Sequence, residues 1–148
     1  MIAGRRKRGN CRLVEPVTHF LTGACLGRAG FNRTTALATA TMTLAAEAPD
    51  LDMIGQFRGP VFGFAHHRGF THSFLGLLIV AGAVVAFMYG IWRLRGRKTS
   101  SGPAPRWGLL FVYAYIAGLS HILLDFTNNY GVRPFWPFWE KWYSWDIV

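Results

Sequence analysis

Histidines and aspartates recur in this sequence at spacings that suit the binding of a metal ion. His121 and Asp125 are four residues apart, so on a helix they share one face and can point at the same ion. His72 closes a histidine-rich stretch, and Asp50 and Asp52 lie in an A-P-D-L-D segment. Imidazole and carboxylate ligands together suit Zn²⁺, or Mn²⁺ and Fe²⁺ at higher coordination. Such an ion lowers the pKa of a bound water to about 7 and so supplies a hydroxide nucleophile.

Two long apolar segments must position these residues. Residues 73–92 carry no charge, and in residues 107–124 the only ionisable side chain of Asp, Glu, Lys, Arg or His type is His121. At about 1.5 Å per residue, a helix over 73–92 spans about 30 Å, the thickness of the hydrocarbon core of a bilayer. The sequence therefore predicts two transmembrane helices. The link between them, residues 93–106, holds five basic residues and no acid, and we expect this loop to be cytoplasmic.

Two shorter segments upstream predict a second hairpin. Residues 16–29 are largely apolar, residues 34–48 are rich in Ala and Thr, and small residues in both suit close helix packing. The alternative is a pair of amphipathic helices that lie on the membrane surface. We therefore expect an all-α fold, an integral membrane bundle of about four helices.

A hairpin brings the start of one helix beside the end of the next, which gathers the titratable residues. His72 precedes the first long helix, while His121 and Asp125 end the second, opposite the basic loop. In the upstream hairpin, His19 lies near one helix start, and the A-P-D-L-D aspartates follow the other helix end. A single histidine near a helix end is usually a surface or core residue. Convergence of five histidines and three aspartates on one end indicates a function, because ionisable groups in membranes are costly.

The remaining segments are predicted to surround that end. Residues 53–66 contain three glycines and a proline and predict a loop. Near the C-terminus, Trp136, Trp139, Trp142 and Trp145 recur every three residues. This spacing predicts a helix face or a turn in the membrane interface, where tryptophan is favoured.

Several segments of the chain resemble a known family. They are E-P-V-T-H-F-L-T-G-A at 15–24, A-P-D-L-D at 48–52, H-R-G-F-T-H-S at 67–73, S-H-I-L-L-D at 120–125 and N-N-Y-G-V-R-P-F-W-P at 128–137. Together they are similar to the membrane-bound metal-dependent hydrolases, also described as LexA-regulated inner-membrane hydrolases. H-R-G-x-T-H-S is the most specific of these motifs. A looser similarity relates the spaced His and Asp residues to zinc-dependent phospholipases C.

The resemblance implies a metal site and hydrolase activity, but it names no substrate. Matched motif by motif, the implied ligands are His19, Asp50, Asp52, His67, His72, His121 and Asp125. These are more than the four ligands of one tetrahedral zinc, so either two ions bind or some residues orient ligands and activate water. Glu47 is the candidate general base, and Thr71, Ser73 and Ser120 are candidate hydrogen-bond donors around the ligands. His66 lies outside the motif.

The leading hypothesis is a membrane-bound enzyme in which metal-activated water attacks an ester or phosphoester of a small-molecule or lipid-derived substrate. The expected cofactor is one or two divalent transition-metal ions, zinc first, with Mn or Fe as alternatives. The alternative function is a non-enzymatic metal-binding or transport-associated membrane protein, although transporters more often hold their ligands near the bilayer midplane. The expected partners are membrane lipids and the substrate. A formal net charge of +9 does not predict a nucleic-acid partner, because the basic residues cluster outside the apolar runs. The oligomeric state is left open.

The charge pattern also predicts localisation and domain limits. We expect a multi-pass protein of the bacterial inner membrane with its metal end extracytoplasmic. Residues 1–14 form a basic N-terminal extension, and residues 15–148 form a single hydrolase-like domain that could continue beyond Val148. The basic cluster of residues 5–12 would lie on the metal side, against the positive-inside rule. We therefore expect translation to begin at Val14; the alternative is a disordered basic arm.

Overall fold

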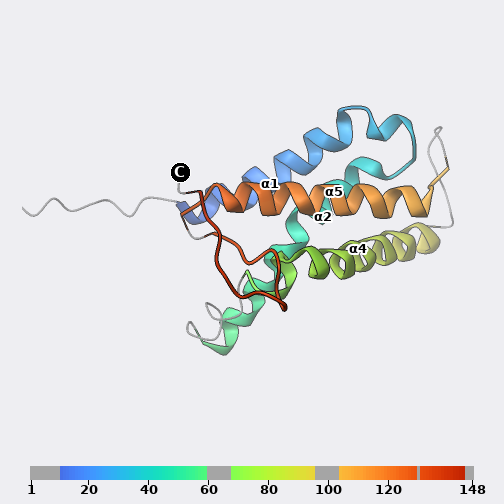
Figure 1. Ribbon diagram of the computed structural model, residues 1–148. Helices are drawn as coiled ribbons and strands as arrows, with labels where there is room; N and C mark the ends of the chain where they lie inside the picture. Colours follow the sequence, from blue (N-terminus) through green and yellow to red (C-terminus); the bar gives the residue numbers. More distant parts are fainter. Residues whose placement is uncertain (1–10, 60–67, 96–103, 130, 146–148) are drawn as a thin grey trace, which may run out of the picture.

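The described chain contains four α-helices, of which the two longest run roughly along a common axis and the first is inclined to them (Figure 1). The computed structural model describes residues 11–59, 68–95, 104–129 and 131–145. The α-helices are α1 (Cys11–Arg28), α2 (Ala38–Glu47), α4 (Phe74–Leu94) and α5 (Trp107–Phe126). Three 3-10 helices join them: η1 (Phe31–Arg33), η2 (Ala48–Arg58) and η3 (Phe70–His72). The described residues contain no strand, only a β-bridge between Val132 and Tyr143, so the predicted all-α class is confirmed.

Helices α4 and α5 pack side by side and antiparallel, and both are long and apolar enough to cross a membrane (Figure 1). Their bounds agree with the predicted segments to within two residues. Ser73 begins α4, because its Oγ accepts a hydrogen bond from the backbone N–H of Gly76 at 2.9 Å. Large apolar side chains such as Ile79, Phe87 and Leu123 point outward, as expected of helix faces in contact with lipid.

The predicted upstream hairpin is confirmed as a packed pair, α1 and α2, that lies against α5. Gly23 permits close approach, because a Cβ at this position would lie 2.7 Å from the Met42 carbonyl oxygen. Helix α2 begins at Ala38 and not near residue 34, because Leu37 before it has a left-handed backbone with φ 66°. With 10 residues it extends about 15 Å, half of a membrane span. Its buried residues place it inside the bundle.

The junctions between helices fix how the two pairs sit together. Thr35, just before α2, accepts a hydrogen bond through Oγ1 from the backbone N–H of Arg106 at 2.8 Å, just before α5. Thr34 Oγ1 and the Tyr113 hydroxyl are 2.8 Å apart and add a second link. Both contacts are at the end of α5 where the chain enters it. The opposite end, where η2, η3 and the end of α5 meet, is left for the titratable residues.

The loop predicted over residues 53–66 is partly wrong. Residues up to Arg58 form the 3-10 helix η2, which continues directly from α2; residues 60–67, like the N-terminal residues 1–10, lie outside the described chain. The tryptophan-rich segment forms the predicted turn, without a helix. It is tied down by the Val132–Tyr143 bridge and by a hydrogen bond from Phe74 N–H to the Pro134 carbonyl at 2.9 Å. Trp139, Trp142 and Trp145 remain exposed beside the metal end.

Candidate metal centre

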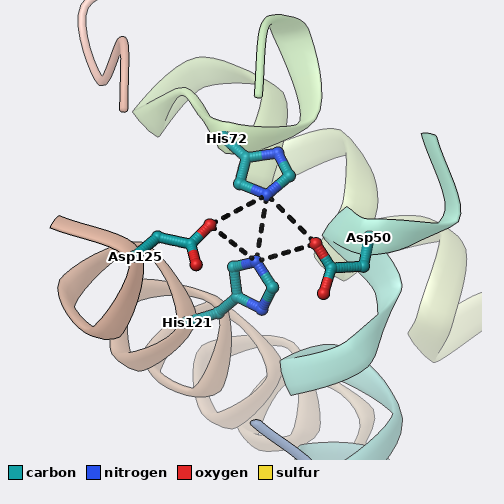
Figure 2. Close-up of side chains that lie close together, drawn as sticks. All are labelled: Asp50, His72, His121 and Asp125. Carbon is teal, nitrogen blue, oxygen red and sulfur yellow. Dashed lines mark hydrogen bonds and ion pairs between the residues drawn. The ribbon is translucent and has the colours of Figure 1, made fainter. Parts of the chain in front are cut away.

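Four side chains from three separate elements converge at this end of the bundle. Asp50 comes from η2, His72 from η3, and His121 and Asp125 from the last turns of α5 (Figure 2). One donor atom from each lies within 4.8 Å of the others. His72, His121 and Asp125 are buried, and Asp50 is partly buried. We call these four residues the metal cluster.

The donor atoms of the cluster form a compact set of contacts. The two Nε2 atoms of His72 and His121 are 3.0 Å apart. His72 Nε2 lies 3.4 Å from Asp50 Oδ1 and 3.3 Å from Asp125 Oδ2, and His121 Nε2 lies 3.5 Å from each of the same two oxygens. Tetrahedral ligands bonded at about 2.0–2.2 Å would be about 3.3–3.6 Å apart. The four distances between an imidazole nitrogen and a carboxylate oxygen therefore match a coordination shell, and the two imidazole nitrogens lie slightly closer together.

The hydrogen bonds on the far side of each ring decide which nitrogen carries the proton. His121 Nδ1 lies 2.6 Å from the Ala46 carbonyl, and because a carbonyl only accepts, Nδ1 must donate. The Thr71 hydroxyl donates to Asp52 Oδ2 at 2.7 Å and is 3.0 Å from His72 Nδ1, from which it can accept. Both neutral imidazoles then direct an Nε2 lone pair into the cluster. Two lone pairs facing each other at 3.0 Å require a cation between them, either a proton or a metal ion.

The carboxylates also favour a positive charge within the cluster. Burial would lower the pKa of His72, but hydrogen bonds to Asp125, Asp50 and Asp52 outweigh it and raise this pKa to about 10. Burial would likewise raise the pKa of Asp50, yet its hydrogen bond with His72 and the charge of nearby His121 lower it below the usual value. Without a metal, the site thus holds a proton tightly on His72.

Two further predicted ligands lie around the cluster. Asp52 Oδ2 is 3.5 Å from His72 Nδ1, on the ring edge opposite Asp50. His19, from α1, stacks on His121 with ring centroids 3.8 Å apart, and its Nε2 lies 3.4 Å from Asp125 Oδ1. Both contacts orient a cluster residue, as neighbours of metal ligands commonly do.

Arg68 is a residue of the candidate site that was not predicted from the sequence. It is 4% exposed and donates from Nη2 to Asp125 Oδ1 at 3.1 Å and from Nη1 to the Gly131 carbonyl at 3.3 Å. Its backbone N–H also donates to Asp52 Oδ2 at 3.1 Å. The signal that could have found it is its place inside the H-R-G-F-T-H-S segment at 67–73, the most specific of the motifs. The carboxylates of Asp50, Asp52 and Asp125 and the guanidinium of Arg68 together carry a formal charge of −2 when the histidines are neutral.

The other predicted residues have different outcomes. Thr71 makes the expected hydrogen bond, but Ser73 and Ser120 donate to backbone carbonyls of Phe70 and Ala117 and do not contact the cluster. The candidate base Glu47 lies one helical turn before Asp50, and its Oε1 is buried without a hydrogen-bond partner among the described residues. His67, a predicted ligand, and His66 lie outside the described residues.

Comparisons with known proteins place this chain in a family. A family model described as "YdjM inner membrane protein" matches residues 14–148. The chain is also 28% identical over 129 residues to "Uncharacterized protein YfhP" of Bacillus subtilis (strain 168), a match that covers 80% of this chain. The chain spans 36% of the length of that relative. No solved structure matches. The inner-membrane part of the predicted resemblance is therefore confirmed, while its hydrolase part stays a prediction: this chain belongs to the YdjM inner membrane protein family.

Proposed function

We propose that the chain is a membrane-bound hydrolase in which Asp50, His72, His121 and Asp125 hold a divalent transition-metal ion. The observation that carries this proposal is the pair of Nε2 atoms 3.0 Å apart between two carboxylates. A formal charge of −2 around the site favours a divalent cation over a single proton. When bound, such an ion would lower the pKa of a coordinated water to about 7.

The number of protein donors bears on which metal would support catalysis. Four protein ligands fill the shell of a tetrahedral zinc, whereas catalytic zinc sites usually keep one position for water. Zinc with five ligands, or Mn²⁺ or Fe²⁺ with six, would leave room for that water. Asp50 is the most exposed of the four side chains, at 17% against 3% or less for the others. We therefore propose that water and substrate reach the site beside Asp50.

The proposed reaction is hydrolysis of an ester or phosphoester. A bond forms from the water oxygen to the carbonyl carbon or the phosphorus, and the bond from that atom to the alcohol oxygen breaks. The departing alkoxide takes up the proton released by the water. Glu47, near Asp50, is the candidate carrier of this proton, since its buried Oε1 has no other described hydrogen-bond partner. Arg68 and His19 hold Asp125 by Oδ1 and leave Oδ2 facing the two imidazoles.

The position of the cluster supports an enzyme over a metal transporter. His121 and Asp125 lie in the last turns of α5, at one end of an apolar helix, whereas transporters more often bind their ions near the midplane. The basic link of residues 93–106 follows the other end of α4. By the positive-inside rule, we propose a multi-pass topology in the inner membrane with the metal cluster on the extracytoplasmic face.

Metal analysis and a substrate panel test this function together. The protein purified in detergent is analysed for bound metal, then depleted and reloaded with Zn²⁺, Mn²⁺ or Fe²⁺ before assay with carboxylesters and phosphoesters. We expect wild type and Ser120→Ala to bind metal and to hydrolyse one of the esters tested, because the Ser120 hydroxyl donates to the Ala117 carbonyl of its own helix. His72→Ala and Asp125→Ala should lose both properties. Full metal occupancy in the variant that combines His72→Ala with Asp125→Ala would overturn the metal site. Metal binding by wild type without hydrolysis of any substrate would favour the non-enzymatic alternative.

A further inference from the structure

An apolar groove of about 410 Å³ opens beside the metal cluster, between the α2–η2 junction and α4. Its first wall is formed by Leu44, Glu47, Ala48 and Leu51. This volume lies in the range of about 300–1,000 Å³ that is typical of small-molecule sites. Among the described residues of the lining, Glu47 provides the only ionisable side chain.

The second wall belongs to a helix that is able to cross the membrane. Val80, Ala83, Val84 and Phe87 line the groove from α4, with the spacing of one helix face. Along the axis of α4, this wall begins about 9 Å and ends about 20 Å from Phe74, which lies at the cluster end of the helix. The groove therefore lies at the depth of the hydrocarbon core, where the surrounding medium consists of acyl chains.

The groove and the metal cluster share one stretch of backbone. Asp50, a cluster residue, lies between Ala48 and Leu51, which line the groove. Glu47, one turn earlier, also lines the groove, and its Oε1 is buried without a described hydrogen-bond partner. The polar side chains nearest in sequence to the groove wall are thus Glu47, which lines it, and Asp50, which belongs to the metal cluster.

We propose that the groove binds one acyl chain of a membrane lipid and presents the ester or phosphoester of that lipid to the metal cluster. This inference rests on the proposed hydrolase function and names its substrate class. An acyl chain fits because the lining is apolar apart from Glu47 and because α4 is surrounded by lipid. A soluble substrate would gain nothing from a groove at this depth.

Two alanines of α4 provide a matched pair of variants. Ala83 lines the groove and is exposed, so Ala83→Trp fills the groove without entering the core. Ala86 is also exposed but does not line the groove, so Ala86→Trp places the same side chain on another part of the helix surface. Both variants should fold and keep wild-type metal content, since neither residue contacts the cluster.

Photo-crosslinking measures occupancy of the groove independently of catalysis. The protein is reconstituted in vesicles of phosphatidylglycerol that contain a small fraction with a diazirine in one acyl chain, and the labelled residues are mapped by mass spectrometry. We expect labelling to concentrate on the groove lining and to fall at least fivefold in Ala83→Trp but not in Ala86→Trp. Equal labelling around α4, or labelling only in the second apolar hollow near Leu119, Leu123 and Phe135, would overturn the inference.

Chain-length dependence then separates this inference from the proposed function. On a long-chain lipid ester, we expect Ala83→Trp to lower kcat/KM at least tenfold, with little change on a short-chain ester and no change in Ala86→Trp. If wild type hydrolyses esters and Ala83→Trp leaves the long-chain rate intact, the groove inference fails while the hydrolase function stands. If groove labelling is specific but no ester is cleaved, the proposed function fails, and with it the role of the groove in presenting a substrate.

Discussion

Gly76 in the first turn of α4 packs directly against the carbonyl of Phe70 in η3, so closely that a Cβ at Gly76 would overlap that oxygen. This approach lets η3 fold back over the start of α4, where Ser73 bonds both Phe70 and Gly76. His72 sits between these residues in sequence. The glycine therefore determines where a cluster imidazole is placed, although it touches no ligand atom.

Gly76→Ala should displace η3 and reduce metal binding. The added methyl group must push backbone, which costs about 1–3 kcal/mol in a packed site. Gly90→Ala is the matched control in the same helix, because a Cβ there meets no atom within 4 Å. We expect Gly90→Ala to be neutral or to stabilise by up to about 1 kcal/mol. Unfolding in detergent and metal content measure both effects, and normal metal content in Gly76→Ala would contradict this role.

Arg68→Met should destabilise the protein chiefly through Asp125. Removal of the guanidinium takes a permanently charged partner away from a buried carboxylate, a loss of about 3–5 kcal/mol for buried ion pairs. In an Asp125→Asn background the same substitution should cost much less, because the charge is gone. A double-variant cycle of unfolding free energies, measured without metal, gives the coupling. Additive effects would mean that Arg68 acts through Gly131 or Asp52 and not through Asp125.

The transmembrane pair and the gathering of the cluster at one end could be predicted from the sequence. Uncharged segments of about the length of a membrane span predict transmembrane helices directly. Antiparallel packing of two such helices then places His72 beside His121 and Asp125. The start of α2 could not be predicted, since nothing in the sequence marks Leu37 as left-handed. Helix propensities describe residues one at a time, whereas Leu37 packs against the buried core of the bundle.

The sequence also could not predict which of the candidate ligands belong to the cluster and which lie around it. Asp50 and Asp52 are two residues apart, and the rotation of η2 places them on opposite edges of the His72 ring, at Nε2 and Nδ1. Only the structure distinguishes these positions. Arg68 was missed for a related reason: arginine is usually solvent-exposed, and its burial here depends on an Asp125 that is distant in sequence.

Metal affinity should rise with pH. The pKa of His72 is raised to about 10 in the metal-free protein, so below that pH a metal ion must displace a proton. We expect affinity to increase about tenfold per pH unit between pH 7 and 9, with release of close to one proton. Titration calorimetry in two buffers of different ionisation enthalpy measures this release. Affinity that does not change with pH would show that His72 is not protonated in the metal-free protein.

The same raised pKa has the opposite effect on the metal-free fold. A group whose pKa is higher when folded stabilises the fold fully below its unfolded pKa of 6.5, and this contribution is lost as the pH rises toward about 10. We therefore expect metal-free protein to lose stability from pH 7 to pH 10, and His72→Gln to lose less. Chemical unfolding at several pH values measures this slope. An equal slope in both proteins would assign the pH dependence to other groups.

The orientation of the bundle can be tested with single cysteines. After Cys11 and Cys25 are replaced by serine, Ser101→Cys reports the basic link and Gly63→Cys reports the segment between Asp52 and His72. We expect an impermeant maleimide to label Gly63→Cys in spheroplasts and Ser101→Cys only after lysis, because basic loops are retained in the cytoplasm. Metal content of each variant serves as the control for a native fold. The reverse labelling pattern would place the metal cluster on the cytoplasmic face, and a substrate would then have to reach it from the inner leaflet.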